Sequence, residues 1–198
     1  MGMMKKMTAM MLSVILLCAA CGALAETAAL PAYVYTGEDP IEGAIADMLA
    51  ESGRGEDFLT EPGYVMIPCV IIHRTEMEGD ARAKVYCTLW VMNYVLRGEV
   101  LETLSGGETA AVVTLEQADG VWKVTALAEA GEGSEYVRDV EHFAGGDKEL
   151  EQLYFAGEDL GTEGNEAIRN RFIRDYAEAN DLAVTAWQDF GWDPVPLQ

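Results

Sequence analysis

The spacing of apolar residues predicts an amphipathic helix near the start of the globular part of the chain. Asp39 and Pro40 form a helix-start signal, because an Asp side chain caps exposed backbone N–H groups and proline suits the first helical position. Glu42 has the spacing of a capping box, and Gly53 predicts the end of the helix. Between these signals, apolar residues recur every three or four positions, as on one buried helix face. They are Ile41, Ala44, Ile45, Met48 and Leu49.

The period then changes to that of β-strands, with runs rich in β-branched and aromatic residues between polar or glycine-containing turns. Pro68 lies inside the first run and predicts an edge or bulged strand, because proline cannot donate to a ladder. Ser105-Gly106-Gly107 predicts a break at which glycine supplies positive φ. Asp119-Gly120 predicts a tight hairpin turn. The predicted strands cover residues 64–72, 83–96, 100–104, 109–116 and 121–127.

Helical periodicity returns in the last third of the chain. Ser134 and Asp147 have the residue types and positions of helix caps. A third segment carries an apolar stripe from Ile168 to Tyr176. The predicted helices cover residues 135–143, 148–155 and 165–179, and a short strand lies within 182–187.

One amphipathic helix followed by an antiparallel meander predicts a helix lying across a curved sheet, because neither element can bury its apolar side alone. The predicted fold class is therefore α+β, with an N-terminal helix packed on a curved antiparallel meander sheet and additional C-terminal helices. No internal repeat divides the chain. We expect a signal peptide over 1–25, a linker over 26–38 and a single domain over 39–198.

Four segments together carry a family resemblance. They are Val85-Tyr86-Cys87-Thr88-Leu89-Trp90, Ser105-Gly106-Gly107, Leu115-Glu116 to Trp122-Lys123-Val124, and Gly133-Ser134-Glu135-Tyr136. In this order, after a helix, they resemble exported bacterial domains of unknown function in the cystatin-like or NTF2-like class, over roughly residues 39–143. The resemblance implies a pocket between the concave sheet face and the helices. The chain departs from enzymatic members, since no Asp/His/Tyr set occupies alternate inward strand positions.

The first residues have the pattern of a bacterial export signal. The basic pair Lys5-Lys6 precedes a short apolar run, and small residues lead up to Ala25. That run is too short for a membrane span, which takes about 20 residues. We therefore expect an exported mature chain that begins at Glu26, secreted or at the cell envelope, with no membrane span. The alternative is a lipid anchor at Cys21, although the leucine that such signals normally carry is missing.

Charge narrows the classes of partner. Acidic residues outnumber basic ones by 34 to 13, a net charge of −21. Without the two signal lysines the balance is 34 to 11, or −23. Such a chain lacks the basic surface that binds phosphate groups, which excludes nucleic acid and disfavours anionic membranes. The charge indicates a soluble surface, and the alternatives are a basic partner or Ca²⁺.

Cysteines and histidines give no strong metal signal. Cys69 and Cys87 remain in the mature chain, in runs that face each other across a predicted hairpin. They are interpreted either as a disulfide, which export favours, or as two buried thiols. A closed zinc site needs four ligands, so we expect no metal and no cofactor. The turn Glu76-Glu78-Asp80 lacks the spacing of a Ca²⁺ loop and predicts a solvated hairpin tip.

Alternation along the run 83–96 places Tyr86, Trp90 and Tyr94 on one face. If that face lines a pocket, these aromatic rings could stack on a ligand. The alternative is that they are core residues whose polar atoms are hydrogen-bonded inside the domain.

Histidine supplies the only candidate for acid–base chemistry. His73 is the ionisable type with a pKa nearest to neutral, and Glu76 or Asp80 could orient it only from a turn. His142 is interpreted as an exposed helix-end residue beside acids. We therefore expect no catalytic residues and an exported, non-enzymatic domain that binds a protein or a small ligand. The alternatives are an enzyme with an inward pocket or an inhibitor of an extracellular enzyme.

The tail from Trp187 to Val195 is unusually aromatic for a chain end. Such residues are expected to pack back onto the domain, and if exposed they would mark a partner site. Domains of this class often pair through an open sheet face, so a homodimer is a further expectation.

Overall fold

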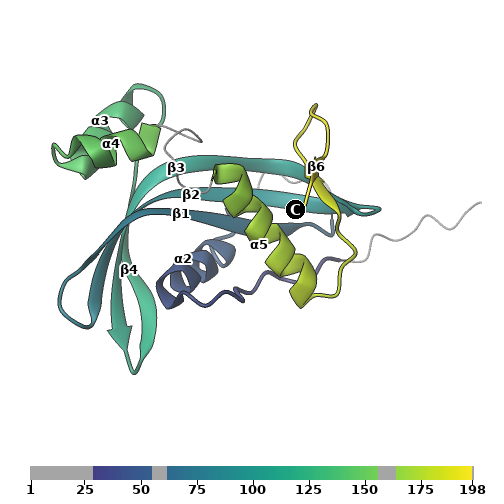
Figure 1. The fold of residues 1–198 in the computed structure, drawn as a ribbon, viewed down its shortest axis with the longest axis horizontal. Helices are drawn as coiled ribbons and strands as arrows, with labels where there is room; N and C mark the ends of the chain where they lie inside the picture. The colour runs from purple at the N-terminus through teal and green to yellow at the C-terminus, as the bar shows by residue number, and fades with distance from the viewer. Residues whose placement is uncertain (1–28, 55–61, 156–163, 198) are drawn as a thin grey trace, which may run out of the picture.

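The computed structural model describes residues 29–54, 62–155 and 164–197. These residues form four helices and one six-stranded, mostly antiparallel sheet, which confirms the predicted α+β class (Figure 1). In chain order the elements are α2 (Pro40–Ala50), β1 (Val65–Met77), β2 (Arg82–Arg97), β3 (Val100–Ala118), β4 (Val121–Glu129), α3 (Ser134–Ala144), α4 (Lys148–Phe155), α5 (Asn165–Ala179), β5 (Ala186–Gln188) and β6 (Val195–Pro196).

The sheet is built around β3, which pairs along one side with β2. Its other side is shared, because β4 pairs with residues 111–118 and β5 joins residues 100–102 in parallel. Residues 103–110 have no strand on that side within the described part of the chain. The strand β1 forms one edge of the sheet, as Pro68 predicts.

The predicted break at Ser105-Gly106-Gly107 is wrong, because β3 runs through it without interruption. The irregularity is a bulge that leaves Leu104 as the extra residue between two paired positions. Neither glycine has positive φ. A Cβ at Gly106 would lie 2.2 Å from Met92 Sδ and 2.8 Å from the carbonyl oxygen of Val91. The glycine is therefore required for close contact with β2 rather than for a turn.

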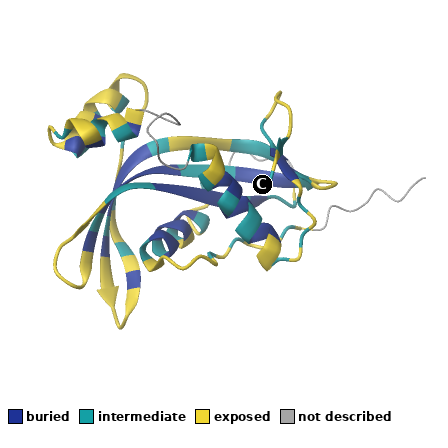
Figure 2. Ribbon diagram, in the orientation of Figure 1, coloured by how far each residue is buried: buried dark blue, intermediate teal, exposed yellow. Residues whose placement is uncertain are grey.

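The helices cover different parts of the two sheet faces. The helices α3 and α4 lie at the opposite end of the sheet from the β5–β6 hairpin, and α5 crosses β1 (Figure 1). Buried side chains line the sheet and the inward helix faces, whereas hairpin tips are exposed (Figure 2). The small cluster under α3 and α4 comprises Tyr86, Ala110, Val112, Val140, Ala144, Leu150 and Tyr154. A larger cluster holds α2 and α5 against the sheet.

The start of α2 follows the predicted signals with one difference. Asp39 Oδ1 accepts hydrogen bonds from the backbone N–H groups of Ile41 and Glu42, and Pro40 is the first helical residue. Glu42 does not complete a capping box. Its carboxylate instead pairs with Arg171 of α5 at 2.7 and 2.9 Å, so that it ties the first helix to the last.

The segment before α2 packs on the domain over its described residues 29–38. Tyr176 donates a hydrogen bond from its hydroxyl to the Pro31 carbonyl oxygen at 2.8 Å. Tyr35 donates to Glu42 at 2.5 Å, and Leu30 and Tyr33 contact the main cluster. The predicted signal peptide 1–25 and Cys21 lie outside the described residues.

The two cysteines are free, buried thiols. The predicted hairpin of β1 and β2 forms, but its register places Cys69 opposite Trp90 and Cys87 opposite Ile72. Three strand positions separate the cysteines by about 10 Å, and an odd offset places them on opposite sheet faces. A disulfide needs Cα atoms within about 7 Å, so the structure supports the free-thiol interpretation.

We predict that both thiols resist alkylation in the folded protein and react after unfolding. Burial raises the pKa of Cys69 to about 12 and also raises the pKa of Cys87, which leaves little reactive thiolate. Mass spectrometry after iodoacetamide treatment, with and without guanidinium, measures this. A disulfide would instead give a mass lower by two hydrogens, and the cysteines would not be alkylated even in guanidinium.

Candidate functional site

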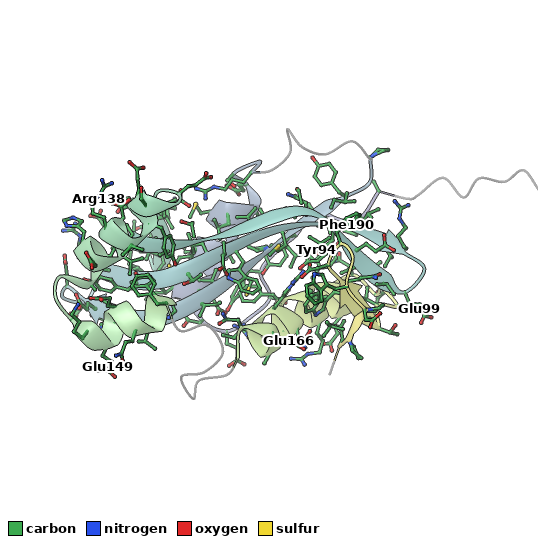
Figure 3. All side chains as sticks on the ribbon, turned by 90° about the horizontal axis from the view of Figure 1, so that it is seen from above. Tyr94, Glu99, Arg138, Glu149, Glu166 and Phe190 are labelled. Carbon is green, nitrogen blue, oxygen red and sulfur yellow. The ribbon has the colours of Figure 1, made fainter. Side chains whose placement is uncertain are left out.

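The three predicted ligand-binding aromatics share one sheet face but enter different surroundings. Tyr86 is buried under α3 and α4 and donates to Glu76 at 3.2 Å. Tyr94 is buried at the other end of β2, in the main cluster (Figure 3). Trp90 lies between them, partly buried, and its indole N–H has no hydrogen-bond partner within the described chain. Their role in ligand binding stays a prediction.

A buried arginine dominates this face. Arg169 of α5 is 3% exposed, and its Nε donates to the Tyr94 hydroxyl at 2.8 Å. Its two terminal nitrogens donate to the Asp189 carboxylate at 2.9 and 2.8 Å, and one also reaches Thr103 Oγ1 at 3.0 Å. The guanidinium carbon lies 3.6 Å from the ring centre of Trp187. Four segments distant in sequence therefore meet at one cation.

The charges of this network are mutually stabilised. Hydrogen bonds from Arg169 lower the pKa of Asp189, and a hydrogen bond from Thr103 at 2.6 Å acts in the same direction. Burial raises the pKa of Tyr94, which keeps its hydroxyl protonated. The pair of Arg169 and Asp189 thus fixes the chain after α5 on the edge of β3, where β5 pairs in parallel.

Sequence reasoning missed Arg169, although a signal for it existed. It stands three residues before Phe172 and seven before Tyr176, on the apolar stripe of the predicted helix. A charged residue on a buried stripe needs a partner.

A cavity of about 430 Å³ lies over the part of β3 that has no strand on its outer side. Asn93 is fully buried in its wall, and its Nδ2 donates to Ser105 Oγ at 3.1 Å and to the Arg54 carbonyl oxygen at 3.3 Å. The Asn93 Oδ1 atom has no partner within the described residues. We call this cavity the Asn93 pocket. Its lining residues are Arg54, Leu89, Val91, Asn93 and residues 105–109.

The Asn93 pocket is mostly apolar, and Arg54 and Glu108 are its charged lining residues. Leu89 and Val91 provide its apolar wall on β2, and Gly106 and Gly107 add no side chains. Arg54 at its rim is paired with both carboxylate oxygens of Glu129, which raises the pKa of the guanidinium. Among the described side chains of this wall, Asn93 Oδ1 is a buried acceptor without a partner.

The pocket uses the odd-numbered residues of β2, on the opposite face from Tyr86, Trp90 and Tyr94. The sequence carried a signal for this face also. Asn93 is a lone amide between Val91 and Val95 in an otherwise apolar alternation.

The aromatic tail divides into a packed and an exposed part. Trp187 is 6% exposed and donates its indole N–H to Asn170 Oδ1 at 2.6 Å, so the expectation of packing is correct there. It is wrong for Phe190 and Trp192, which are 95% and 75% exposed. Gly191 between them has a φ of 81°, which allows the tight turn that presents both rings.

His73 does not have the partner that a general base would need. Its Nε2 lies 2.9 Å from Thr88 Oγ1, and its ring packs edge-on against Tyr154 at 4.9 Å. Burial lowers the pKa of His73 to about 4, so the ring is neutral at neutral pH. Glu76, suggested as an orienting carboxylate, instead accepts from Tyr86.

The remaining candidates have simple structural roles. His142 lies exposed in the last turn of α3, as expected. In the acidic turn, Glu78 pairs with Arg82 at 3.3 Å. Within the described residues, no three His, Cys, Asp or Glu side chains are grouped as metal ligands.

Comparison of the chain with protein-family models, curated proteins and solved structures finds no match. The cystatin-like or NTF2-like resemblance therefore stays a prediction. Over the part of the chain that the structure describes, no helix has the length and apolar character needed to cross a membrane.

We predict that lowering the pH from 6.5 to 4 destabilises the wild-type protein more than the His73→Phe variant. The unfolded chain binds a proton at His73 near pH 6.5, whereas the folded chain resists it until about pH 4. Neutral His73 therefore contributes stability above pH 6.5 that is lost as the pH falls through this window. The difference is about 3 kcal/mol.

Urea unfolding of both proteins at several pH values measures this effect. Carboxylates titrate in both chains, so their contribution cancels in the comparison. Equal pH slopes for the two proteins, or an NMR titration of His73 with a midpoint near 6.5, would contradict the prediction.

Proposed function

We propose that this chain is an exported, non-enzymatic domain that binds a small, neutral, mostly apolar molecule in the Asn93 pocket. The observation that carries the proposal is the Asn93 Oδ1 atom, which is buried in the pocket wall without a partner in the described chain. The ligand that fits it bears an N–H or O–H donor on an apolar body.

The unpaired Asn93 oxygen is energetically unfavourable in the empty pocket. A buried acceptor without a hydrogen bond costs about 1–3 kcal/mol, and a ligand that donates to it removes that cost. The Asn93 amide is held in place by its bonds to Ser105 and Arg54, so its oxygen is fixed before a ligand arrives. A volume of about 430 Å³ lies within the usual range for small-molecule sites.

Charge argues for a neutral ligand. Among the described lining residues, the pairing of Arg54 with Glu129 leaves no unpaired cation for an anionic ligand, and the Glu108 carboxylate would repel one. Leu89 and Val91 would not solvate a charged group of either sign. A neutral amide or alcohol loses less hydration free energy than a charged group does when it enters this pocket.

The export part of the proposal rests on the sequence. The signal pattern over residues 1–25 and the resemblance to exported domains both support it. Cleavage before Glu26 and lipidation at Cys21 are the two forms to distinguish. The alternative of an enzyme loses its one candidate base, because His73 has Thr88 rather than a carboxylate as its partner. No contact of the described residues favours the inhibitor alternative.

Native mass spectrometry of the mature protein from an exporting host tests the proposal, with Val91→Phe as the pocket variant. We expect a mass excess on the wild-type chain that is lost on denaturation. Phenylalanine at position 91 fills the pocket without removing a hydrogen bond, so this variant should lose the excess. Val121→Phe is the matched control, because Val121 is 56% exposed on β4 and does not line the pocket.

If the natural ligand dissociates during purification, a second measurement with added ligands still tests the pocket. Saturation-transfer NMR with a library of neutral amide and alcohol fragments should give signals with the wild type and the Val121→Phe control but not with Val91→Phe. Equal signals from all three proteins, or none from any, would contradict the proposal. The denatured mass also reports the mature N-terminus, and the native mass reports monomer or dimer.

A further inference from the structure

We infer that the exposed turn Phe190-Gly191-Trp192 is a docking site for a basic segment of a partner protein. The occupant is a lysine or arginine side chain, flanked by apolar residues, that stacks on the Trp192 ring and pairs with Asp193. This surface is separate from the Asn93 pocket, because the two share no lining residue.

The two aromatic rings are the most exposed of the large apolar side chains that the structure describes. Phe190 is 95% exposed and Trp192 is 75% exposed, with only Gly191 between them. Aromatic rings of this size bury large areas when they bind and are enriched at the centres of protein interfaces. Two of them within three residues, both exposed on an otherwise strongly acidic chain, offer apolar area that a partner can bury.

The turn is held in a defined shape before any partner binds. Gln188 donates from its side-chain amide to the Trp192 carbonyl oxygen at 2.6 Å, and the Trp192 N–H donates to the Asp189 carbonyl oxygen at 3.1 Å. The carboxylate of the same Asp189 is held by buried Arg169. A partner therefore meets a fixed aromatic surface and does not have to order a loop.

Residues of the turn line two hollows. One, of about 170 Å³, is lined by Glu102, Thr103 and residues 188–191. The other, of about 330 Å³, is lined by Trp187, Asp189, Trp192, Asp193 and Val195. The first has room for one side chain and the second for a long side chain such as arginine with a neighbouring group, so a short segment could place adjacent side chains in the two hollows.

Charge identifies the occupant as a cation. Of the three carboxylates that line the hollows, Asp189 is paired with Arg169 and Glu102 with Arg97. Asp193 forms no ion pair with the described basic residues and lines the same hollow as Trp192. The mature chain carries 34 acidic and 11 basic residues, so its field attracts basic partners and repels acidic ones.

The chain itself contains the same type of contact inside the fold. The Arg169 guanidinium lies over the Trp187 ring at 3.6 Å and pairs with the neighbouring Asp189. On the surface, Trp192 is likewise followed by a carboxylate, Asp193. No arginine of the described chain lies on the Trp192 ring as Arg169 lies on that of Trp187. Tryptophan is the best ring for such contacts.

NMR titration with two synthetic tripeptides tests the inference. The probe is acetyl-Leu-Arg-Leu-amide, and its control carries citrulline, a neutral analogue of similar shape, in place of arginine. We follow the indole N–H signal of Trp192, which the Trp192→Phe variant assigns. We expect saturable shifts with the arginine peptide and about fivefold weaker binding of the citrulline peptide, from the loss of the cation contacts.

Two charge variants separate specific docking from general attraction. Asp193→Asn should reduce binding of the arginine peptide to that of the citrulline peptide. Glu132→Gln removes one exposed acid near α3, at the other end of the molecule, and should leave binding unchanged (Figure 3). Because Asp193 and Glu132 are exposed, both variants should fold, and the buried indole of Trp187 reports this.

Three results would overturn the inference. The first is equal binding of both peptides, which would show that the turn recognises only apolar groups. The second is an equal effect of both charge variants, which would show non-specific attraction. The third is a Trp192 signal that shifts with protein concentration alone, since the occupant would then be a second copy of the chain.

Discussion

The buried guanidinium of Arg169 is the interaction on which the placement of α5 and of the chain after it depends. It reaches from α5 to Tyr94 and Thr103 of the sheet and to Asp189 of the chain end. A buried cation is tolerated only when its donors are satisfied and its charge is paired. The bonds from Arg169 to Asp189 hold β5 at the edge of β3 and fix the turn that follows β5. The exposed aromatic turn is therefore a consequence of a charge inside the core.

The Asn93 pocket follows from how the edge of β3 is divided. The strand β4 pairs with one end and β5 with the other, so residues 103–110 keep an open side within the described chain. On the odd-numbered face of β2, Gly107 of β3 lies opposite Val91 and adds no side chain, which leaves space between Ser105 and Thr109. The two proposed sites share no lining residue.

Local signals predicted the fold well because they act over a few residues. The cap at Asp39, the turn at Asp119-Gly120 and the edge position of Pro68 each follow from one backbone requirement, and the structure confirms them. The predicted break at Gly106 was wrong because glycine has two uses, turning the chain and allowing close contact. Sequence alone cannot choose between these uses without the neighbouring strand.

Features that depend on contacts between distant parts of the chain could not be predicted from local sequence patterns. The pairing of Cys69 and Cys87 depended on strand register, in which a shift of a few residues changes both distance and face. The roles of Arg169 and Asn93 depended on partners far along the chain, although each stood out as polar on an apolar pattern. Hydrogen exchange at the Trp187 amide in wild type and Asp189→Ala tests the central role of Arg169 most directly. The account predicts that the substitution speeds exchange at Trp187 by about a hundredfold relative to Leu89 in the core. Equal acceleration at both amides would contradict it.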